Sequence, residues 1–571
     1  MGTLVLQNFK GELPRIDPQV LPDIFAQVAK NVKFDAGNLT PLRTSSLVST
    51  LPADASTIYL MDQTWLSWAN TNIDVAKAPV ASGRIYYTGD GSPKVRNGST
   101  VYNLALPAPT AAPTVVNLST PTATLLEEVF YAYTYVTSLG EESAPSPLST
   151  LLSTSANVTV RVSGFASAPA GRAISSLRIY RSQTSASGVT SLYFVSERPI
   201  ITTSYDHAIT TEPLSELIPS TDYDPPPSSL TGLVAMPNGM MAAFLDNTVY
   251  FCEPYVPHAW PDKYTMKTEF PIVGLAVFGS MLAVLTRGSP YIMQGSHPDA
   301  MISEKMERSL PCMSKQGIVD IGTAAIYPST DGLVMIGPGD AKVITKNMFS
   351  RDQWNAFQPE SMIAERFDGK YLFKRVTTAY DAYNGGTASG FAEGTYTLLD
   401  GKQSGVSAGR VTISAGTADS SFGVQQLGLI DYEGAEASFV EIDIEVPLSM
   451  AFDDPTSNLY LLRSDKRTIV KWENSNSVFS TSKWKSKSFV HAPTTFGAAY
   501  IKCNDAPNAE DTFFVRIYGD RSLVSTLTAA NKVVRLPAKP PATIWEVEVE
   551  SSVPITSIYL AGTVDELMAV L

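Results

Sequence analysis

The chain has 571 residues, of which 44% are hydrophobic and 10% aromatic, so it has enough apolar side chains to build several buried cores. Charged residues make up only 17%, and Ser, Thr, Gly and Pro supply much of the remaining polarity, a balance that favours short strands and turns over long charged helices. The net charge of −13 argues against a general nucleic-acid-binding protein, which needs a basic surface.

Residues 1–50 are predicted to form an extended arm with one short helix. Pro14, Pro18 and Pro22 exclude a continuous helix early in the chain. The segment Asp23–Lys30 can form a short helix with its first residue as N-cap and its apolar residues on one face. The first residues show neither the basic region nor the apolar segment of a signal peptide, and no apolar run is long enough to span a membrane.

Residues 51–105 alternate between apolar and polar side chains and are predicted to be strands that join the main body. A Gly-Asp-Gly-Ser-Pro sequence at 89–93 interrupts them. It lacks the Lys-Ser/Thr ending and the following helix of a phosphate-binding P-loop, so we interpret it as a plain turn.

Residues 106–227 are predicted to form a β-sandwich, entered through the Pro-rich linker 106–113. A Tyr-x-Tyr-x-Tyr strand at 131–135 is followed by a predicted turn at 140–147 and by further short strands at the spacing of a sandwich. The Tyr-x-Tyr strand, the Glu-Ser-x-Pro-Ser turn at 142–146 and an Ile-Tyr-Arg strand at 179–181 resemble a fibronectin type III-like module, of the immunoglobulin-like class, which implies an adhesive spacer.

Residues 228–375 contain paired apolar segments that recur every 15 to 20 residues or so, with turns between them. This recurrence predicts β-propeller-like blades, and a stacked or curled sheet is the alternative. The Gly- and Ser-rich segment 376–440 is predicted to be an inserted β-hairpin or small sheet, and 441–571 to supply C-terminal strands that complete the body. The predicted fold is therefore mainly β and multi-domain.

Two blocks of opposite charge lie near the C-terminus. Residues 411–462 hold nine acidic side chains and no Lys or Arg. In the alternating segment around 439–446, Glu441, Asp443 and Glu445 are predicted to share one strand face. Their spacing of about 7 Å approaches that of glycosidase carboxylates, but an exposed strand face lacks the cleft that raises the pKa of one acid. Solvation, or the lining of a channel, is the preferred interpretation.

The basic block at 463–502 has eight Lys and Arg side chains. Lys483, Lys485 and Lys487 alternate along a predicted strand and therefore share one face. Three interpretations remain open for this face: contact with DNA phosphates, pairing with acidic neighbours in an oligomer, or a solvated sheet edge that lysines protect from aggregation.

The sequence contains no recognisable catalytic or metal-binding motif. The four histidines are isolated from one another and from carboxylate clusters, there is no Gly-x-Ser-x-Gly motif, and the three cysteines include no Cys-x-x-Cys. The acidic loop 453–458 has oxygen ligands for Ca²⁺ but not the spacing of an EF-hand. We therefore predict a protein that is not an enzyme and has no catalytic, cofactor or metal site.

An ordered series of short motifs runs through the chain. It is strongest in residues 9–43, 84–94, 238–261, 482–497 and 533–567. The motifs in these stretches include Gly11-to-Pro41, Asn247–Pro254 followed by Pro257-His-Ala-Trp-Pro261, Trp484-Lys-Ser-Lys-Ser-Phe489, and Arg535-Leu-Pro537 followed by Trp545–Val549. Together these motifs resemble the tail nozzle (tail tubular B-like) proteins of short-tailed bacteriophages. The sandwich and the Gly-rich segment are less typical of that family.

The resemblance implies a structural virion protein that forms a homohexameric ring at the distal end of the tail. It implies contact with a tail adaptor protein, with tail fibres or spikes, and transiently with genomic double-stranded DNA. Such a protein is assembled in the host cytoplasm and located in the virion tail. The resemblance would place Glu441, Asp443 and Glu445 in the channel and loops of 376–440 at the nozzle tip. A receptor-binding or fibre-type tail protein is the main alternative, and a glycan hydrolase the third.

Overall fold

The computed structural model describes residues 3–77, 79–80, 83–123, 126–184, 188–379, 387–389, 394–397, 403–407, 410–412, 422–432 and 437–571. In these ranges the regular structure is nearly all strand, with two short α-helices, α1 (Arg351–Asn355) and α2 (Val564–Met568), so the predicted mainly β fold is confirmed. The chain divides into two compact units, described separately below. The first comprises Met1–Thr71, Arg287–Pro290 and Met306–Leu571, and the second comprises Asn72–Thr286 and Tyr291–Lys305.

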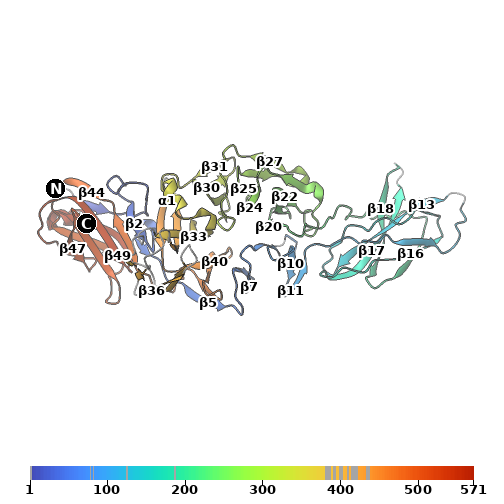
Figure 1. Ribbon diagram of the computed structural model, residues 1–571, viewed down its shortest axis with the longest axis horizontal. Helices are drawn as coiled ribbons and strands as arrows, with labels where there is room; N and C mark the ends of the chain where they lie inside the picture. Colours follow the sequence, from blue (N-terminus) through green and yellow to red (C-terminus); the bar gives the residue numbers. More distant parts are fainter. Residues whose placement is uncertain are drawn as a thin grey trace. The chain divides into compact units, whose positions relative to one another are not determined.

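The second unit contains three four-stranded antiparallel meanders, in sheet order β11-β10-β9-β8, β20-β21-β22-β23 and β24-β25-β26-β27 (Figure 1). Their strands are β8 (Asp74–Lys77), β9 (Arg84–Thr88), β10 (Lys94–Asn97), β11 (Thr100–Asn103), β20 (Thr231–Ala235), β21 (Met241–Leu245), β22 (Thr248–Phe251), β23 (Thr265–Lys267), β24 (Ile272–Phe278), β25 (Met281–Thr286), β26 (Tyr291–Gln294) and β27 (Ile302–Lys305). The first strand β20 packs against both β8 and β24. Successive meanders that meet through their first strands are typical of propeller blades, and the propeller-like architecture is confirmed.

Strand β21 shows how one apolar segment serves two neighbouring sheets. Ala242 and Phe244 belong to a core shared with the β24–β27 meander, whereas Met241 and Ala243 belong to a core shared with the β8–β11 meander. Because side chains alternate between the two faces of a strand, a strand that is covered on both faces has a continuous apolar sequence.

The predicted β-sandwich is present in the second unit between β11 and β20. It consists of the sheets β12-β16-β19, β14-β17-β18 and β13-β15. Their strands are β12 (Thr114–Asn117), β13 (Glu127–Val129), β14 (Tyr131–Thr137), β15 (Leu152–Thr154), β16 (Thr159–Ser163), β17 (Ile174–Thr184), β18 (Thr190–Pro199) and β19 (Ser204–Ala208). The three tyrosines of β14, at 131, 133 and 135, are buried in one core with Val160 and Val162 of β16.

The segment 143–149, predicted to be part of a turn, lies along the edge of β14 instead. Three serines, spaced three residues apart, each form two hydrogen bonds with one tyrosine of β14. The serine backbone N–H donates to the tyrosine carbonyl, and the serine Oγ accepts the tyrosine backbone N–H. The pairs are Ser143–Tyr135, Ser146–Tyr133 and Ser149–Tyr131. This arrangement satisfies a strand edge that would otherwise be open to pairing with another chain.

The first unit repeats the meander pattern. It contains the sheets β28-β29-β30-β31 and β40-β41-β42-β5 and the hairpin β6-β7, and contacts link β28 to β32, β32 to β40, and β40 to β6. The strands are β5 (Ser46–Thr50), β6 (Thr57–Met61), β7 (Thr64–Trp68), β28 (Val319–Asp320), β29 (Ala325–Ser329), β30 (Gly332–Gly337), β31 (Asp340–Val343), β40 (Pro447–Asp453), β41 (Asn458–Arg463) and β42 (Thr468–Lys471). The strands predicted in 51–105 are thus real but divide between the two units after Thr71.

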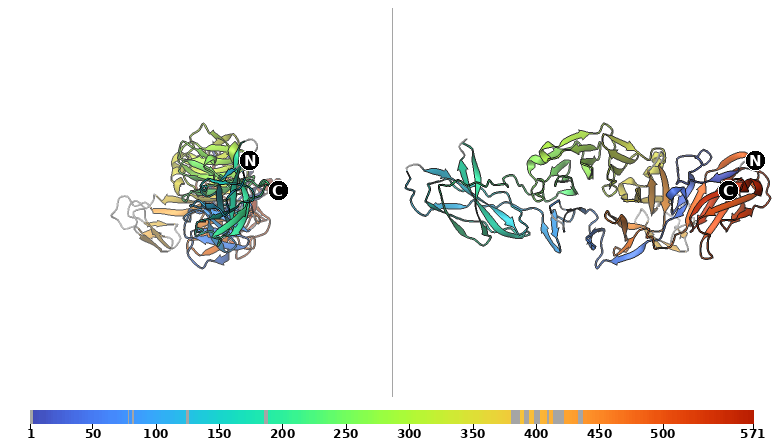
Figure 2. Two further views of the ribbon diagram at one scale, coloured as in Figure 1. Left: turned by 90° about the vertical axis from the view of Figure 1, so that its right-hand side faces the viewer. Right: turned by 180° about the vertical axis from the view of Figure 1, so that it is seen from behind.

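A ten-stranded sheet joins a meander of the first unit to its C-terminal strands, which are drawn in orange and red in Figure 2. Its order is β32-β33-β38-β39-β2-β43-β49-β46-β47, with β44 also paired to β49. The strands are β2 (Ala26–Lys30), β32 (Ile363–Phe367), β33 (Lys370–Ala379), β38 (Phe422–Asp431), β39 (Ser438–Ile442), β43 (Ser482–Ser486), β44 (Phe489–Thr494), β46 (Phe513–Gly519), β47 (Ser522–Leu527) and β49 (Ala542–Ser551). A second sheet, β1-β50-β45-β48, contributes to the same core. It is formed by β1 (Leu4–Leu6), β45 (Ala498–Cys503), β48 (Val533–Arg535) and β50 (Ile555–Ala561).

The helix predicted at Asp23–Lys30 is wrong, because β2 occupies the middle of the ten-stranded sheet. It pairs antiparallel with β43 and parallel with β39, and the backbone N–H of Ala29 donates to the Glu12 carboxylate at 2.6 Å. Leu4 and Phe9 are buried in the same core. The N-terminal segment is therefore an integral part of the first unit and not a separate arm.

The insertion predicted over 376–440 is shorter than expected, because residues 376–379, 422–431 and 438–440 belong to β33, β38 and β39 of the ten-stranded sheet. The inserted segment is the part of the chain between β33 and β38. A four-stranded sheet, β34-β37-β36-β35, is present in it, as predicted for a small inserted sheet. Its strands are β34 (Thr387–Ser389), β35 (Gly394–Thr397), β36 (Gln403–Ser407) and β37 (Arg410–Thr412). The remaining residues between 380 and 421, including the predicted tip loops, lie outside the described residues.

Candidate functional site

The three acidic residues predicted to line a channel do not share a strand face. Strand β39 ends at Ile442, so only Glu441 lies in the strand, and Asp443 and Glu445 follow it. Asn31 fixes this end: its side-chain amide donates to Asp443 Oδ1 at 2.7 Å, and its Oδ1 accepts the backbone N–H of Asp443 at 3.1 Å. The prediction that all three lie in one strand is therefore wrong, because Asp443 and Glu445 come after its end.

Each of these carboxylates has a cationic partner within the chain. The ion pairs are Lys30–Asp443 at 2.6 Å, Lys30–Glu441 at 3.5 Å, Arg375–Glu441 at 3.6 Å and Arg463–Glu445 at 2.8 Å. Because intrachain partners compensate much of their charge, these residues are a weak source of an acidic field. Their place in a channel stays a prediction.

The lysine run also pairs within the chain. Lys483 lies 3.9 Å from Glu550, Lys485 lies 2.9 Å from Glu546 and Lys487 lies 3.0 Å from Asp23. Strand β43 lies between β2 and β49, so the interpretation as a solvated sheet edge is wrong. The shared face holds for Lys483 and Lys485, on the side opposite the buried Trp484, whereas Lys487 follows the end of the strand.

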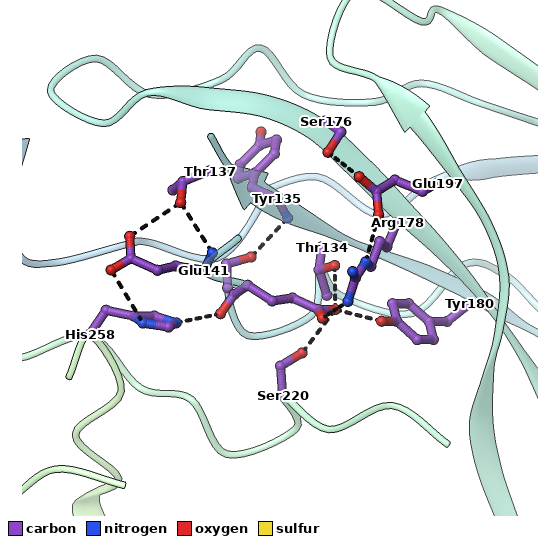
Figure 3. Close-up of polar contacts among 12 residues, drawn as sticks. Thr134, Tyr135, Thr137, Glu141, Ser176, Arg178, Tyr180, Glu197, Ser220 and His258 are labelled. Carbon is purple, nitrogen blue, oxygen red and sulfur yellow. Dashed lines mark hydrogen bonds and ion pairs between the residues drawn. The ribbon is translucent and has the colours of Figure 1, made fainter. Parts of the chain in front are cut away.

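The sandwich is held to the β20–β23 meander by a junction that the sequence did not predict. The turn around Pro257–Pro261, which carries the Trp motif, meets the turn Gly140–Ser143 of the sandwich through side chains far apart in sequence (Figure 3). His258 Nε2 lies 2.8 Å from the backbone carbonyl oxygen of Glu142, and the Trp260 backbone N–H donates to the backbone carbonyl of Asp224 at 2.7 Å. His258 Nδ1 also lies 4.0 Å from Glu141 Oε1, so the expectation that this histidine is isolated from carboxylates is wrong.

Glu142 lies on the sandwich side of this junction, where its backbone carbonyl faces His258 and its side chain is held within the sandwich. Its carboxylate is buried and accepts hydrogen bonds from Thr134 Oγ1 at 2.7 Å, Tyr180 Oη at 2.5 Å and Ser220 Oγ at 3.3 Å. Arg178 Nη1 pairs with it at 2.8 Å, and Figure 3 shows Thr134, Tyr180, Ser220 and Arg178 converging from different segments. Burial, followed by the hydrogen bond to the carboxylate, raises the pKa of Tyr180, so the phenol stays a donor.

Glu141 forms a second part of the junction, in which not every buried polar atom has a hydrogen-bond partner among the described residues. Its Oε2 accepts from Thr137 Oγ1 at 3.2 Å and pairs with Arg172, whose Nη1 also donates to the carbonyl of Asn103 at 2.6 Å. Its Oε1 has no hydrogen-bond partner among the described residues, and neither does His258 Nδ1, which lies 4.0 Å away. Burial lowers the pKa of His258 and the pKa of Arg172 below their usual values.

A cavity of about 260 Å³ opens at this junction. Arg84, Glu141, Arg178, Tyr223 and His258 are among its lining residues. A larger cavity of about 860 Å³ lies in the first unit, but charged residues that line it pair with each other, as Lys33 does with Glu473 and Arg366 with Asp454. The junction is the stronger candidate site because it brings unpartnered, buried polar atoms together.

Other reactive groups lie apart from the junction's unpartnered atoms. Among the described residues no group of three or more His, Cys, Asp or Glu side chains is placed to hold a metal ion. The three cysteines are buried, and burial raises the pKa of each thiol to about 12. Within the described ranges, no helix combines the length and apolar character needed to cross a membrane.

No known protein family matches the sequence, and no curated protein does. Among solved structures, the N-terminal domain of Nup159 is 10% identical with a TM-score of 0.22, covering 51% of this chain and 86% of its own. The C-terminal WD40 domain of Sif2 is also 10% identical with a TM-score of 0.22, covering 76% and 99%. A complex of S. cerevisiae Dbp5 with Nup159 and Gle1 is 12% identical with a TM-score of 0.17, covering 45% and 93%. Likenesses of this size carry no conclusion about function.

Proposed function

We propose that this chain is a structural subunit of the tail nozzle of a short-tailed bacteriophage. In this proposal six copies form a ring that joins a tail adaptor, carries fibres or spikes, and lets genomic double-stranded DNA pass during ejection. The subunit is assembled in the host cytoplasm and is found in the virion tail. The proposal assigns it no catalytic activity, cofactor or resident metal.

The observation that carries the proposal is the ordered series of motifs described above. Two of these motifs lie where contacts with distant parts of the chain restrict the sequence. The stretch from Gly11 to Pro41 contains β2, whose neighbours in the sheet lie more than 400 residues later, and the Pro257–Pro261 motif supplies the junction residues His258 and Trp260. Short motifs that are required by packing, and not by chemistry, fit a protein whose role is geometric.

The charge of the chain is compatible with this role. A net charge of −13 gives DNA little to adhere to, and mild repulsion keeps a polyanion sliding through a channel. Lys483, Lys485 and Lys487 are each close to an acidic residue of the same chain, so the proposal gives them no role in DNA contact.

Mass photometry of the purified chain, with and without the adaptor protein of the same phage, tests the proposal. We expect six copies in the complex with the adaptor. A chain that stays monomeric and never joins the adaptor contradicts the proposal.

A receptor-binding or fibre-type tail protein is the second candidate, and the sandwich is the observation that favours it, because such modules often serve adhesion. A stable trimer that does not bind the adaptor in the same measurement would support this alternative.

A further inference from the structure

The larger cavity of the first unit, of about 860 Å³, lies where the ends of several strands converge. The β32–β33 hairpin contributes Arg366–Gly369, and the β40–β41 hairpin contributes Asp454 and Asn458. The end of β42 and the residues after it contribute Lys471–Glu473. The volume falls in the range of about 300–1,000 Å³ that is usual for ligand pockets. Because binding residues often lie on turns that a rigid scaffold positions, the cavity has the size and the place of a binding site.

The charges around the cavity nearly cancel. Four carboxylates and three cations line it, namely Asp35, Asp368, Asp454 and Glu473, and Lys33, Arg366 and Lys471. Lys33 Nζ lies 2.8 Å from Glu473 Oε1 and 3.1 Å from Asp35 Oδ2, and Arg366 pairs with Asp454. The excess of one carboxylate disfavours an anionic ligand, and these pairs remove much of the attraction of the carboxylates for a cationic ligand.

The paired groups still have hydrogen bonds to offer. An ionised carboxylate has about four lone-pair sites, and a guanidinium has five N–H donors, so one ion pair uses only part of each. Lys471 forms no ion pair within the described part of the chain, so its ammonium can donate to a neutral oxygen. The walls therefore present both donors and acceptors, and the ion pairs hold several of them in place before a ligand arrives.

Aromatic side chains lie beside these polar groups. The half-buried rings of Phe367 and Phe452 line the cavity, and the Arg366 guanidinium lies 4.3 Å from the centroid of the Phe452 ring. Trp472, also in the wall, packs edge-on against Phe367 at 6.2 Å. Trp472 is 2% exposed, and its Nε1–H has no hydrogen-bond partner among the described residues. A hydroxyl oxygen is the kind of acceptor that this indole lacks.

We propose that this cavity binds a neutral saccharide. A sugar ring has apolar C–H faces that pack on aromatic rings, and each of its hydroxyl groups donates one hydrogen bond and accepts two. A neutral molecule with these groups can bind beside the ion pairs without breaking them. The proposal goes beyond the tail function and does not depend on it, since it follows from a cavity within one chain.

Saturation-transfer NMR of the full chain tests the site with neutral trisaccharides of glucose, galactose, mannose and N-acetylglucosamine. We expect at least one of them to bind, with an affinity that changes less than about twofold between about 50 mM and 500 mM NaCl, because the ligand has no charge to be screened. Trigalacturonate is the charged counterpart of similar size and should bind at least about tenfold more weakly than the best neutral trisaccharide.

A pair of tryptophan substitutions locates the binding. Thr323 is an exposed lining residue in the turn between β28 and β29, and its side chain makes no hydrogen bond within the described residues. Thr323→Trp fills part of the cavity without removing such a contact and should weaken binding at least about tenfold. Ser464→Trp is the matched control, because Ser464 is exposed in the turn between β41 and β42 and is not a lining residue. This control should bind like the wild type.

A third variant covers the case in which Thr323→Trp does not fold. Lys471→Met removes one donor of the wall while keeping an unbranched side chain, so the affinity should fall about 3- to 10-fold. The proposal is overturned if none of the four neutral trisaccharides binds, or if trigalacturonate binds more tightly than all of them. It is also overturned if Thr323→Trp folds and binds like the wild type, or if Lys471→Met leaves the affinity unchanged.

Discussion

Replacing Glu142 by Gln tests how far the sandwich depends on the buried Glu142 side chain. Four side-chain donors converge on this carboxylate, and one of them is the Arg178 guanidinium. The amide in Glu142→Gln has nearly the same shape but brings its own N–H donors, so at least one existing donor is left without an acceptor.

The stability lost in Glu142→Gln depends on how exposed the partners of this side chain are. Removing one member of a buried ion pair costs about 3–5 kcal/mol. Arg178 is 30% exposed and keeps Glu197 as a second partner at 2.9 Å, which reduces its loss. We therefore expect the sandwich to lose about 2–3 kcal/mol, which corresponds to a decrease in amide protection of about 30- to 150-fold.

Hydrogen exchange of peptides covering β14 measures this loss, since the amides of Tyr133 and Tyr135 are held by Ser146 and Ser143. Glu197→Gln is the matched control: it removes the same charge from the other side of Arg178, but Glu197 is 42% exposed and the loss should stay below about 1 kcal/mol. Equal losses in the two variants would show that burial does not make the Glu142 side chain more important to the sandwich than the exposed Glu197.

Three further predictions follow from other contacts. Burial raises the pKa of Glu12 to about 8, so the stability that the protonated Glu12 side chain contributes is lost as the pH rises toward 8. Glu12→Gln should therefore be more stable than wild type at pH 9 by at least about 1 kcal/mol and should lose this advantage at pH 5, as measured by denaturation of the first unit. Lys30→Met removes the lysine that lies 2.6 Å from Asp443 and should lower the stability of the first unit by about 1–2 kcal/mol in the same assay. Lys483→Met is the control, because Lys483 lies 3.9 Å from its partner Glu550, and it should change the stability by less than about 0.5 kcal/mol. A thiol reagent should label none of the three cysteines in the native protein and all three after denaturation, because all are buried with raised pKa values; rapid labelling of native protein would contradict this.

Local pattern was sufficient for many strands. The alternation at 131–135 and the turn at 89–93 correspond to β14 and to the connection between β9 and β10. The apolar segment at 240–244 was also recognised, because a strand buried on both faces needs apolar side chains at every position. These signals are carried by neighbours in sequence, so the sequence alone reveals them.

The failures share one physical cause, which is pairing between distant residues. Asp23–Lys30 has a pattern that suits a helix, but its partners in the sheet are Glu441 and Ser486. The acidic strand was predicted to continue past Ile442, but it ends there, and the next residue, Asp443, is hydrogen-bonded to Asn31. The contact between His258 and Glu142 spans 116 residues and has no signature in either segment. Tertiary contacts override local preference at such positions.

Averaged electron micrographs of the purified chain bound to its adaptor test the proposed ring of six copies around a channel, since symmetry and a central opening are visible without labels. We expect sixfold class averages with a central opening. Averages that show a threefold rod, or a compact particle without an opening, would contradict the proposed ring.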